Sequence, residues 1–355
     1  MTPLRAVTNA LFVFPKRIIH NYRLLIKDTY TIKIDSHFSK RECVMQNKRL
    51  KTTTMMCMLM LNVSFRCRAS EHPQEDHNTS VGKKVNFFTS MEWQHKKRKL
   101  LMNKYLPNGS SALKTMLFLE AIYGKNNFFK RPALFEAKIP KKIHQIWLGP
   151  KIPPAVFKKS RESIKKYHPD WEYKLWTDND IPDLQLHNQK FYDLSNNYGE
   201  RADIVRYEIL YKFGGVYADV DFICFKPFDI LSQYDLWASL EPMDIAGGPG
   251  INNAIIGSIP NHPILDLCIS TIKESWYTGK SIFARVGPKH FKKSFLTCAE
   301  KDHDNIIALP RSFFYPLDFQ SGMWKLKGKI DYKLLHSAIR PESFAVHLWA
   351  GTWRK

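Results

Sequence analysis

The stretch GERADIVRYEILYKFGGVYADVDFICFKPFDIL, residues 199–231, decides the fold that this sequence can adopt. From Ala202 to Phe213 the residues are mostly apolar and good helix formers, and Gly214-Gly215 then supplies the left-handed residue that ends many helices. Residues 216–223, VYADVDFI, are β-branched and aromatic enough for a strand. The stretch therefore predicts a helix, a glycine stop and a strand that carries two carboxylates.

The two carboxylates belong to Asp219 and Asp221. The period of two in a strand puts them on one face with Tyr217, roughly 7 Å apart along that face. They repel each other unless something positive lies beside them, and carboxylates completed by phosphate oxygens and water suit Mg²⁺ or Mn²⁺. A solvated strand end is the alternative interpretation, because a D-x-D alone is a weak motif.

The predicted helix contributes a second charged pair, Asp203 and Arg206. At positions i and i+3 the two residues share one face of a segment that is otherwise largely apolar. Charges in such a segment are costly unless they are paired or used in binding. The alternative is an ion pair on the helix surface, but the occurrence of both acidic motifs in one short stretch favours a functional site.

Three motifs in this stretch carry a family resemblance: R-A-D-x-x-R-Y, L-Y-K-F-G-G-V-Y and D-V-D, in this order and without a gap. The stretch resembles the DXD-containing sugar-binding region of family 32 glycosyltransferases, which include inositol-phosphoceramide mannosyltransferases and Golgi initiating mannosyltransferases. The resemblance extends from about Ile139 to the C-terminus. It implies an α/β fold of the GT-A type, a single Rossmann-like domain with a mixed, mainly parallel central sheet flanked by helices.

The resemblance also implies roles for individual residues. Asp221 is expected to bind Mn²⁺ or Mg²⁺ directly, and Asp219 to do so through water or to hold the ribose. Asp203 and Arg206 are expected to hydrogen-bond the donor hexose, with Arg206 also stabilising phosphate charge. The four residues form the predicted catalytic set.

Further positions match the family pattern outside the central stretch. His347, in FAVHLWAGTW at residues 344–353, is implied as a third metal ligand, although a histidine on an apolar strand is usually a core residue. Either Asn252 or Asn253 matches an asparagine that contacts the donor sugar, and Asn252 is favoured. The other implied donor-binding residues are Trp147 near the nucleobase, Tyr217 beside the ribose or sugar, and Trp353 in the closing loop.

The implied reaction is hexosyl transfer from a nucleotide diphosphate sugar to a glycan or glycolipid, with retention of configuration. We expect mannose from GDP-mannose, since the local sequence is nearer the mannosyltransferase branch. Galactosyl, glucosyl or N-acetylglucosaminyl transfer from a UDP-sugar is the alternative. No evident covalent nucleophile is present, so front-side attack by the acceptor hydroxyl is the expected route.

The sequence predicts further elements on either side of the central stretch. Residues 142–148 form a strand between prolines and glycine, residues 153–167 a helix, and residues 171–177 a second strand. A strand, helix and strand in this order imply a parallel pair at the start of an α/β sheet. Residues 251–259 follow a glycine-rich loop and predict another strand.

The charge of +21 lies mainly in the N-terminal third. Residues 1–135 hold 24 Lys and Arg against 8 Asp and Glu, whereas residues 136–355 hold 30 against 25. We therefore predict a basic N-terminal region at 1–135 and a glycosyltransferase domain at 136–355, with no nucleic acid as partner. Residues 52–65 are uncharged and suit a signal anchor, although a buried segment is equally compatible with their length. A signal anchor would place the protein in a Golgi or other secretory-pathway membrane, with a luminal catalytic domain.

Two rival classes explain parts of the pattern. A haloacid-dehalogenase-type phosphatase also places D-x-D after a strand, but it expects Thr or Val where Ile223 stands. A non-catalytic polyanion-binding protein would explain the charge and leave both acidic motifs without a purpose. The six cysteines form no CxxC pair, which argues against a zinc site.

Overall fold

The computed structural model describes residues 85–91, 109–130, 136–241, 248–322 and 329–352. The predicted signal anchor at 52–65 and the predicted donor-binding Trp353 lie outside these described residues. The predicted division of the chain at residue 135 stays a prediction. Within the described ranges, none of the helices has both the length and the apolar character needed to cross a bilayer.

A six-stranded sheet forms the centre of the described fold, in the order β2-β1-β3-β6-β5-β7. β1 runs parallel to β2 and β3, and β5 runs parallel to β7, whereas β6 is antiparallel to both of its neighbours, β3 and β5. The predicted α/β architecture, with a mixed and mainly parallel sheet flanked by helices, is confirmed. The strands are β1 Lys142–Ile146, β2 Glu172–Trp176, β3 Gly215–Ala218, β5 Leu236–Leu240, β6 Ile251–Ser258 and β7 Ile306–Leu309.

The first strand, helix and strand form the predicted parallel unit. Helix α6, Ala155–Tyr167, buries a stripe of residues at helical spacing that includes Val156, Phe157 and Ile164, and it leaves lysines toward solvent. His168 ends the helix, and its backbone N–H donates to the Ile164 carbonyl. The crossover places β2 alongside β1 in parallel register, as predicted.

Helix α9, Tyr198–Phe213, leads into the centre of the sheet. It begins four residues before the predicted start because the Asn197 side chain caps it, accepting hydrogen bonds from the N–H groups of Gly199 and Glu200. It ends at Gly214 (φ 61°), as predicted. Gly215 (φ 95°) then starts β3 so close to β1 that a Cβ atom would lie 2.6 Å from the Lys142 carbonyl oxygen.

The predicted continuous strand at residues 216–223 is wrong, because the chain changes sheets at the acidic motif. β3 ends at Ala218, and β4, Phe222–Cys224, pairs with β8, Ala345–His347, in a separate two-stranded sheet. The backbone N–H of Asp219 still donates to Ala254 of the central sheet, and the N–H of Phe222 then donates to the Asp219 carbonyl, which closes a turn. The turn therefore joins the two sheets and brings the C-terminal segment to the acidic residues.

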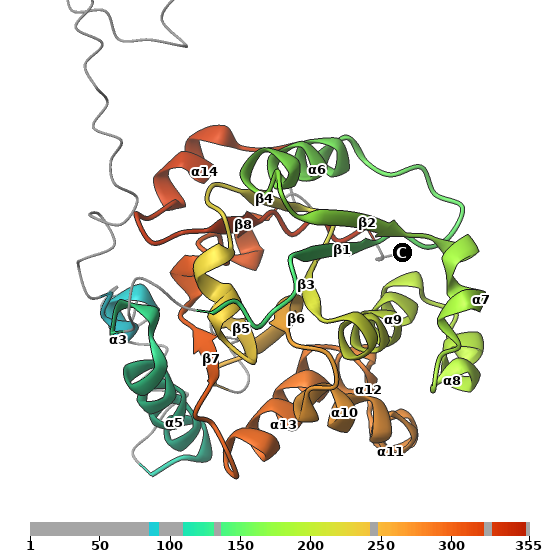
Figure 1. Cartoon of the computed structure of the whole chain (residues 1–355), viewed down its shortest axis with the longest axis horizontal. Coiled ribbons are helices and arrows are strands. Elements are labelled where there is room, and N and C mark those ends of the chain that lie inside the picture. Colours follow the sequence, from blue (N-terminus) through green and yellow to red (C-terminus); the bar gives the residue numbers. More distant parts are fainter. Residues whose placement is uncertain (1–84, 92–108, 131–135, 242–247, 323–328, 353–355) are drawn as a thin grey trace, which may run out of the picture. The chain divides into compact units, whose positions relative to one another are not determined.

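The helices cover both faces of the central sheet (Figure 1). α6 and the β4–β8 pair lie on one side, and α9, α10 and α13 lie on the other. Helix α5 packs against the edge strand β7, where the Asn126 side chain donates to the Ile306 carbonyl. The remaining helices are α3 Phe87–Ser90, α5 Ser111–Asn126, α7 Ile181–Leu184, α8 Gln189–Leu194, α10 Pro263–Ser270, α11 Ile272–Thr278, α12 Ile282–Arg285, α13 Pro288–Ala299 and α14 Tyr332–Ala338.

Candidate functional site

The turn between the two sheets places Asp219, Asp221 and His347 together. Nε2 of His347 lies 3.0 Å from Oδ1 of Asp221 and 3.9 Å from Oδ2 of Asp219. One ligand atom from each of the three residues lies within 4.8 Å of the other two. The structure thus brings the three predicted metal ligands to one point, although they come from a turn and a distant strand instead of one strand face.

Residues 347–350 hold the triad in place through backbone hydrogen bonds and ring contacts. The N–H of Ala350 donates to Oδ2 of Asp221 at 2.6 Å, and the N–H of Leu348 donates to the Asp221 carbonyl. The His347 ring stacks on Phe222 with a centroid distance of 4.7 Å, and Trp349 lies 4.3 Å from it on a tilted plane. These contacts fix the direction in which Nε2 points, toward the two carboxylates.

The donor set of the triad fits a divalent cation. Two carboxylates and an imidazole nitrogen are ligands that Mn²⁺ and Mg²⁺ accept, and small adjustments would bring the three atoms to bonding distance, roughly 2.0–2.2 Å. The Nδ1 atom of His347 is buried and has no hydrogen-bond partner among the described residues, so the polar contacts of this ring all lie on the Nε2 side. The triad is the one such group found in the described part of the chain.

The charges of the triad depend on each other. Burial alone would lower the pKa of His347, but Asp221 and Asp219 raise it above its usual value. Burial would raise the pKa of Asp221, and the His347 imidazole holds it below the usual range. Burial raises the pKa of Asp219, against the effect of Arg206. Because a metal ion would replace the imidazolium proton as the positive group, metal binding at this point releases protons.

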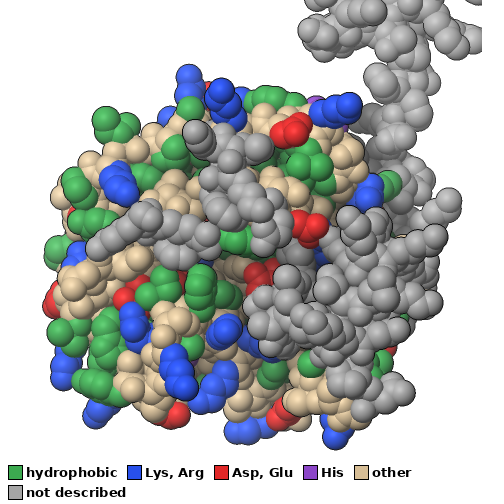
Figure 2. Space-filling view, turned by 180° about the vertical axis from the view of Figure 1, so that it is seen from behind, with side chains coloured by type: hydrophobic (Ala, Val, Ile, Leu, Met, Phe, Trp, Pro, Cys, Tyr) green, Lys and Arg blue, Asp and Glu red, His purple; other side chains and the backbone are tan. Residues whose placement is uncertain are grey.

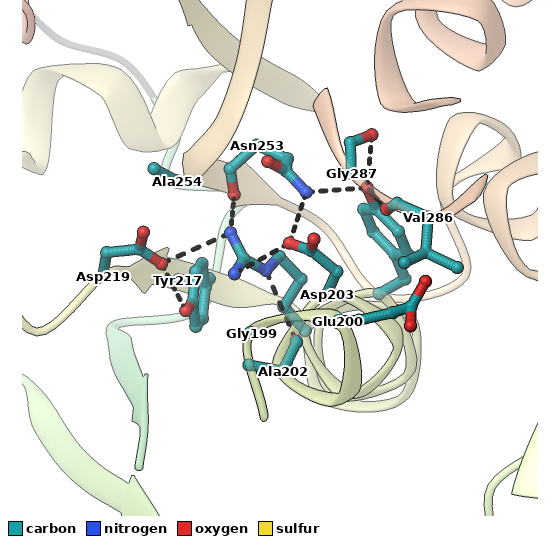
Figure 3. A network of polar contacts seen from close by, with 12 residues as sticks. Gly199, Glu200, Ala202, Asp203, Tyr217, Asp219, Asn253, Ala254, Val286 and Gly287 are labelled. Carbon is teal, nitrogen blue, oxygen red and sulfur yellow. Dashed lines mark hydrogen bonds and ion pairs between the residues drawn. The ribbon is translucent and has the colours of Figure 1, made fainter. Parts of the chain in front are cut away.

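Arg206 of helix α9 pairs with both Asp203 and Asp219, and Figure 3 shows how these two acidic residues lie in the polar network. The Arg206 side chain is 5% exposed, and its guanidinium lies 2.9 Å from Oδ1 of Asp203 and 3.3 Å from Oδ1 of Asp219. It also donates to the Asn253 carbonyl at 2.6 Å and lies over the Tyr217 ring, 4.4 Å from the centroid. The buried Arg206 and the half-buried Asp203 therefore lie beside the DXD turn, and the four predicted catalytic residues lie together.

The pKa of the Asp203 carboxyl group is also shifted by its surroundings. Burial raises the pKa of Asp203 to about 7, although Arg206 opposes the rise. The Asn253 amide donates to Oδ1 of Asp203 at 2.8 Å and to the Tyr207 hydroxyl at 2.9 Å. A carboxyl group in such surroundings can exchange hydrogen bonds with sugar hydroxyls in either protonation state.

The two asparagines that the sequence leaves open have different positions. Asn253 contacts Asp203, whereas the Asn252 side chain donates to Oε2 of Glu241 at 2.7 Å. Adjacent residues of a strand point to opposite faces, so β6 carries one asparagine on each side. The residue that joins the Asp203 network is Asn253, and the favoured Asn252 belongs to a different pair.

The remaining predicted donor-binding residues are less closely tied to this network. The Tyr217 hydroxyl donates to Oδ1 of Asp219 at 2.6 Å. Trp147 follows β1, and its indole N–H donates to the Lys151 carbonyl at 2.8 Å, so a nucleobase role for it stays a prediction. Sequence reasoning missed Trp349, although it stands two residues after His347.

Comparisons with known proteins agree with the resemblance. The family described as "Glycosyltransferase sugar-binding region containing DXD motif" matches residues 154–237. The chain is 34% identical over 162 residues to "Inositol phosphoceramide mannosyltransferase 2" of Schizosaccharomyces pombe, which covers 43% of this chain and 45% of that protein. It is 38% identical over 133 residues to "Inositol phosphoceramide mannosyltransferase 3" of the same yeast, 36% of each chain.

The chain thus spans less than half the length of these two yeast relatives. Among solved structures it is similar to "PaToxG Glycosyltransferase", with a TM-score of 0.41 and 22% identity over 57% of this chain and 81% of that one. The matched family region contains Asp203, Arg206, Asp219 and Asp221. The resemblance drawn from the sequence is confirmed: residues 154–237 match the glycosyltransferase sugar-binding region that contains a DXD motif.

Proposed function

We propose that the protein is a metal-dependent hexosyltransferase that moves mannose from GDP-mannose to a glycolipid of the inositol phosphoceramide class. The observation that carries the proposal is the junction of two groups: the triad of Asp219, Asp221 and His347, and the buried Arg206 beside Asp203. The triad is suited to bind a cation, and the Arg206–Asp203 pair is suited to bind a sugar. A nucleotide diphosphate sugar needs a cation for its diphosphate and hydrogen-bonding groups for its sugar.

Asp219, Asp221 and His347 would hold Mn²⁺ or Mg²⁺. Such an ion, when bound, neutralises the charge that grows on the departing diphosphate. Arg206 adds a fixed positive charge next to Asp219, in surroundings where burial strengthens its effect. The Asn253 amide uses its two N–H groups on Oδ1 of Asp203 and on the Tyr207 hydroxyl, which orients the Asp203 carboxyl group and suits it to hold a hydroxyl of a hexose.

The donor and the acceptor are proposed from the relatives. Two curated proteins that are similar to this chain are named inositol phosphoceramide mannosyltransferases. A UDP-sugar in place of GDP-mannose is the alternative donor. Retention of configuration is part of the proposal, because the family resemblance implies it.

The proposal is tested with the purified full chain, inositol phosphoceramide in detergent micelles, and either Mn²⁺ or EDTA. We expect mannosyl transfer from GDP-mannose that requires the metal and falls at least about 100-fold in Asp221→Ala, since this change removes a metal ligand. Transfer from UDP-galactose, UDP-glucose or UDP-N-acetylglucosamine alone would overturn the choice of mannose. Absence of transfer from all four donors, with the metal bound, would overturn the proposed function.

A further inference from the structure

The tyrosine of the R-A-D-x-x-R-Y motif, Tyr207, has no role in the chemistry proposed above. It is 0% exposed on helix α9, and its ring stacks on Phe291 of α13 with a centroid distance of 6.1 Å and an angle of 13° between the planes. A phenylalanine would bury the same ring without the cost of taking a hydroxyl out of water. The Tyr207 hydroxyl therefore needs an explanation of its own.

The Tyr207 hydroxyl has to donate to a backbone carbonyl. It lies 2.7 Å from the carbonyl oxygen of Val286, at the junction between helices α12 and α13, and a carbonyl oxygen can only accept a hydrogen bond. Burial raises the pKa of Tyr207 well above its usual value, so the phenol keeps the proton that this hydrogen bond requires. Because the hydroxyl has a single proton, an amide that lies against its oxygen from another direction must be the donor.

This direction of the hydrogen bond fixes the side-chain amide of Asn253. Nδ2 of Asn253 lies 2.9 Å from the Tyr207 hydroxyl oxygen and 2.8 Å from Oδ1 of Asp203. With its oxygen in the place of its nitrogen, the amide would direct an acceptor at the tyrosine oxygen and at the carboxylate, and both hydrogen bonds would be lost. Figure 3 shows the Asn253 amide between Asp203 and residues 286–287. The Tyr207 hydroxyl thus favours one orientation of this amide over the flipped one.

The Asn253 amide and Arg206 bind the same oxygen of Asp203. The guanidinium lies 2.9 Å from Oδ1, so both polar contacts that Asp203 makes with described side chains go to one atom. The Asp203 side chain keeps 14% of its surface exposed. A Cβ atom at position 287 would lie 3.3 Å from Oδ2, and because this residue is Gly287, the space beside Oδ2 stays open. Oδ2 is therefore the atom that can accept a hydrogen bond from a hydroxyl of a ligand.

The Val286 carbonyl, which accepts the Tyr207 proton, is itself held against helix α9. The backbone N–H of Val286 donates to the Ile282 carbonyl, which closes the last turn of α12. The neighbouring Arg285 donates from Nε to Oε1 of Glu200 at 2.7 Å, and its Nη2 lies 2.7 Å from the same oxygen. Glu200 is 2% exposed and belongs to the first turn of α9. The acceptor is thus fixed relative to the helix that carries Asp203.

We propose that Tyr207 is a positioning residue for the donor hexose: its hydrogen bond to Val286 orients the Asn253 amide, and this amide holds Asp203 with Oδ2 toward the sugar. The inference rests on the proposed function, which assigns the hexose to Asp203. Tyr207 is buried behind Asn253, so its effect reaches the sugar only through that amide. Loss of the hydroxyl should weaken binding of the hexose and leave binding of the nucleotide unchanged.

The test measures the affinity of the full chain for GDP-mannose and for GDP, each with Mn²⁺, by titration calorimetry. In Tyr207→Phe we expect the Kd of GDP-mannose to rise about tenfold, while the Kd of GDP stays within about twofold, since GDP has no hexose. Tyr234→Phe is the matched control, because Tyr234 is also 0% exposed and its hydroxyl also donates to a backbone carbonyl at 2.7 Å, that of Asn126. This control should change neither Kd, and the melting temperatures of the two variants should fall by similar amounts.

A double-mutant cycle separates the positioning role from a purely structural one. In the Asn253→Ala background the amide is absent, so Tyr207→Phe should raise the Kd of GDP-mannose by less than about twofold further. A tenfold rise in both backgrounds, an equal rise in the Kd of GDP, or a much larger fall in melting temperature than in Tyr234→Phe would overturn the inference and leave the proposed function standing. An unchanged protein that binds GDP with Mn²⁺ but transfers no hexose from any donor would overturn the proposed function, and the inference with it.

Discussion

Nε2 of His347 lies 3.0 Å from Oδ1 of Asp221, although one residue is near the end of the chain and the other follows the third strand of the central sheet. The pairing of β4 with β8 sets this distance, since Phe222 and His347 are partners in that ladder. The geometry of the triad therefore depends on the small second sheet as much as on the DXD turn.

Loss of the imidazole should weaken metal binding. In His347→Ala we expect the affinity for Mn²⁺ to fall by more than the roughly 10–100-fold that follows loss of an outer-shell partner, because a direct ligand is removed. Titration calorimetry with Mn²⁺ alone measures this without any substrate. His336→Ala, an exposed histidine on α14, should bind Mn²⁺ like the unchanged protein. Equal affinities in the two variants would rule out His347 as a ligand.

Arg206 should be important for stability as well as for binding. Arg206→Met leaves the carboxyl groups of Asp203 and Asp219 without their shared cation, and breaking a buried pair typically costs about 3–5 kcal/mol. Urea unfolding should show this loss in the free energy of unfolding. Arg201→Met is the control, because Arg201 is less buried and contacts backbone carbonyls. A loss below about 1 kcal/mol in Arg206→Met would contradict the buried network described above.

Because three histidines are buried, we expect the free energy of unfolding to decrease at acidic pH. Burial lowers the pKa of His144, His168 and His262 to about 4, from an ordinary value of 6.5. Each ring accepts a hydrogen bond on an unprotonated nitrogen, from Trp176, Phe228 and Ile264 respectively. Below pH 6.5 the unfolded chain therefore binds protons that the folded protein does not.

The free energy of unfolding should then be highest above pH 6.5 and fall as the pH decreases toward 4. Each histidine contributes up to about 1.4 kcal/mol per pH unit within this window. Urea unfolding of His168→Gln at several pH values should give a shallower slope by about that amount, whatever its stability at pH 7. His336→Gln should leave the slope unchanged, and an unchanged slope in His168→Gln would show that His168 does not contribute to it.

Two glycines should respond in opposite directions to the same substitution. Gly257 lies in β6, where a Cβ atom would come within 2.0 Å of the indole nitrogen of the buried Trp237, so Gly257→Ala should destabilise the fold by about 1–3 kcal/mol. Gly124 lies inside helix α5 with nothing within 4 Å of a Cβ atom. Gly124→Ala should stabilise by about 0.5–1 kcal/mol, because alanine is the better helix former. Chemical denaturation of both variants checks the signs.

The sequence predicted those parts of the fold and the site that depend on residues close together in the chain. The helix with Asp203 and Arg206 follows from its own apolar pattern and from the glycines that end it, and the parallel pair around α6 follows from strand and helix signals. The break at Asp219 was missed, because residues 216–223 have uninterrupted strand propensity. Which sheet each half joins is decided by partners far away in the chain, and these leave no local signal.

The sequence also could not predict which face of β6 carries Asn252 and which carries Asn253. Choosing between Asn252 and Asn253 requires the register of β6 against β3 and β5, and a shift of one residue exchanges the two faces.

The packing of α5 on β7 has a practical consequence for anyone who prepares the catalytic part alone. Among the described strands β7 pairs on one side only. Helix α5 packs against it through Asn126, whose carbonyl accepts a hydrogen bond from the Tyr234 hydroxyl. A fragment that starts at residue 136 would leave this strand open to β-augmentation and self-association. Soluble, monodisperse material should therefore require residues from about 109 onward, and light scattering of the two lengths would show the difference.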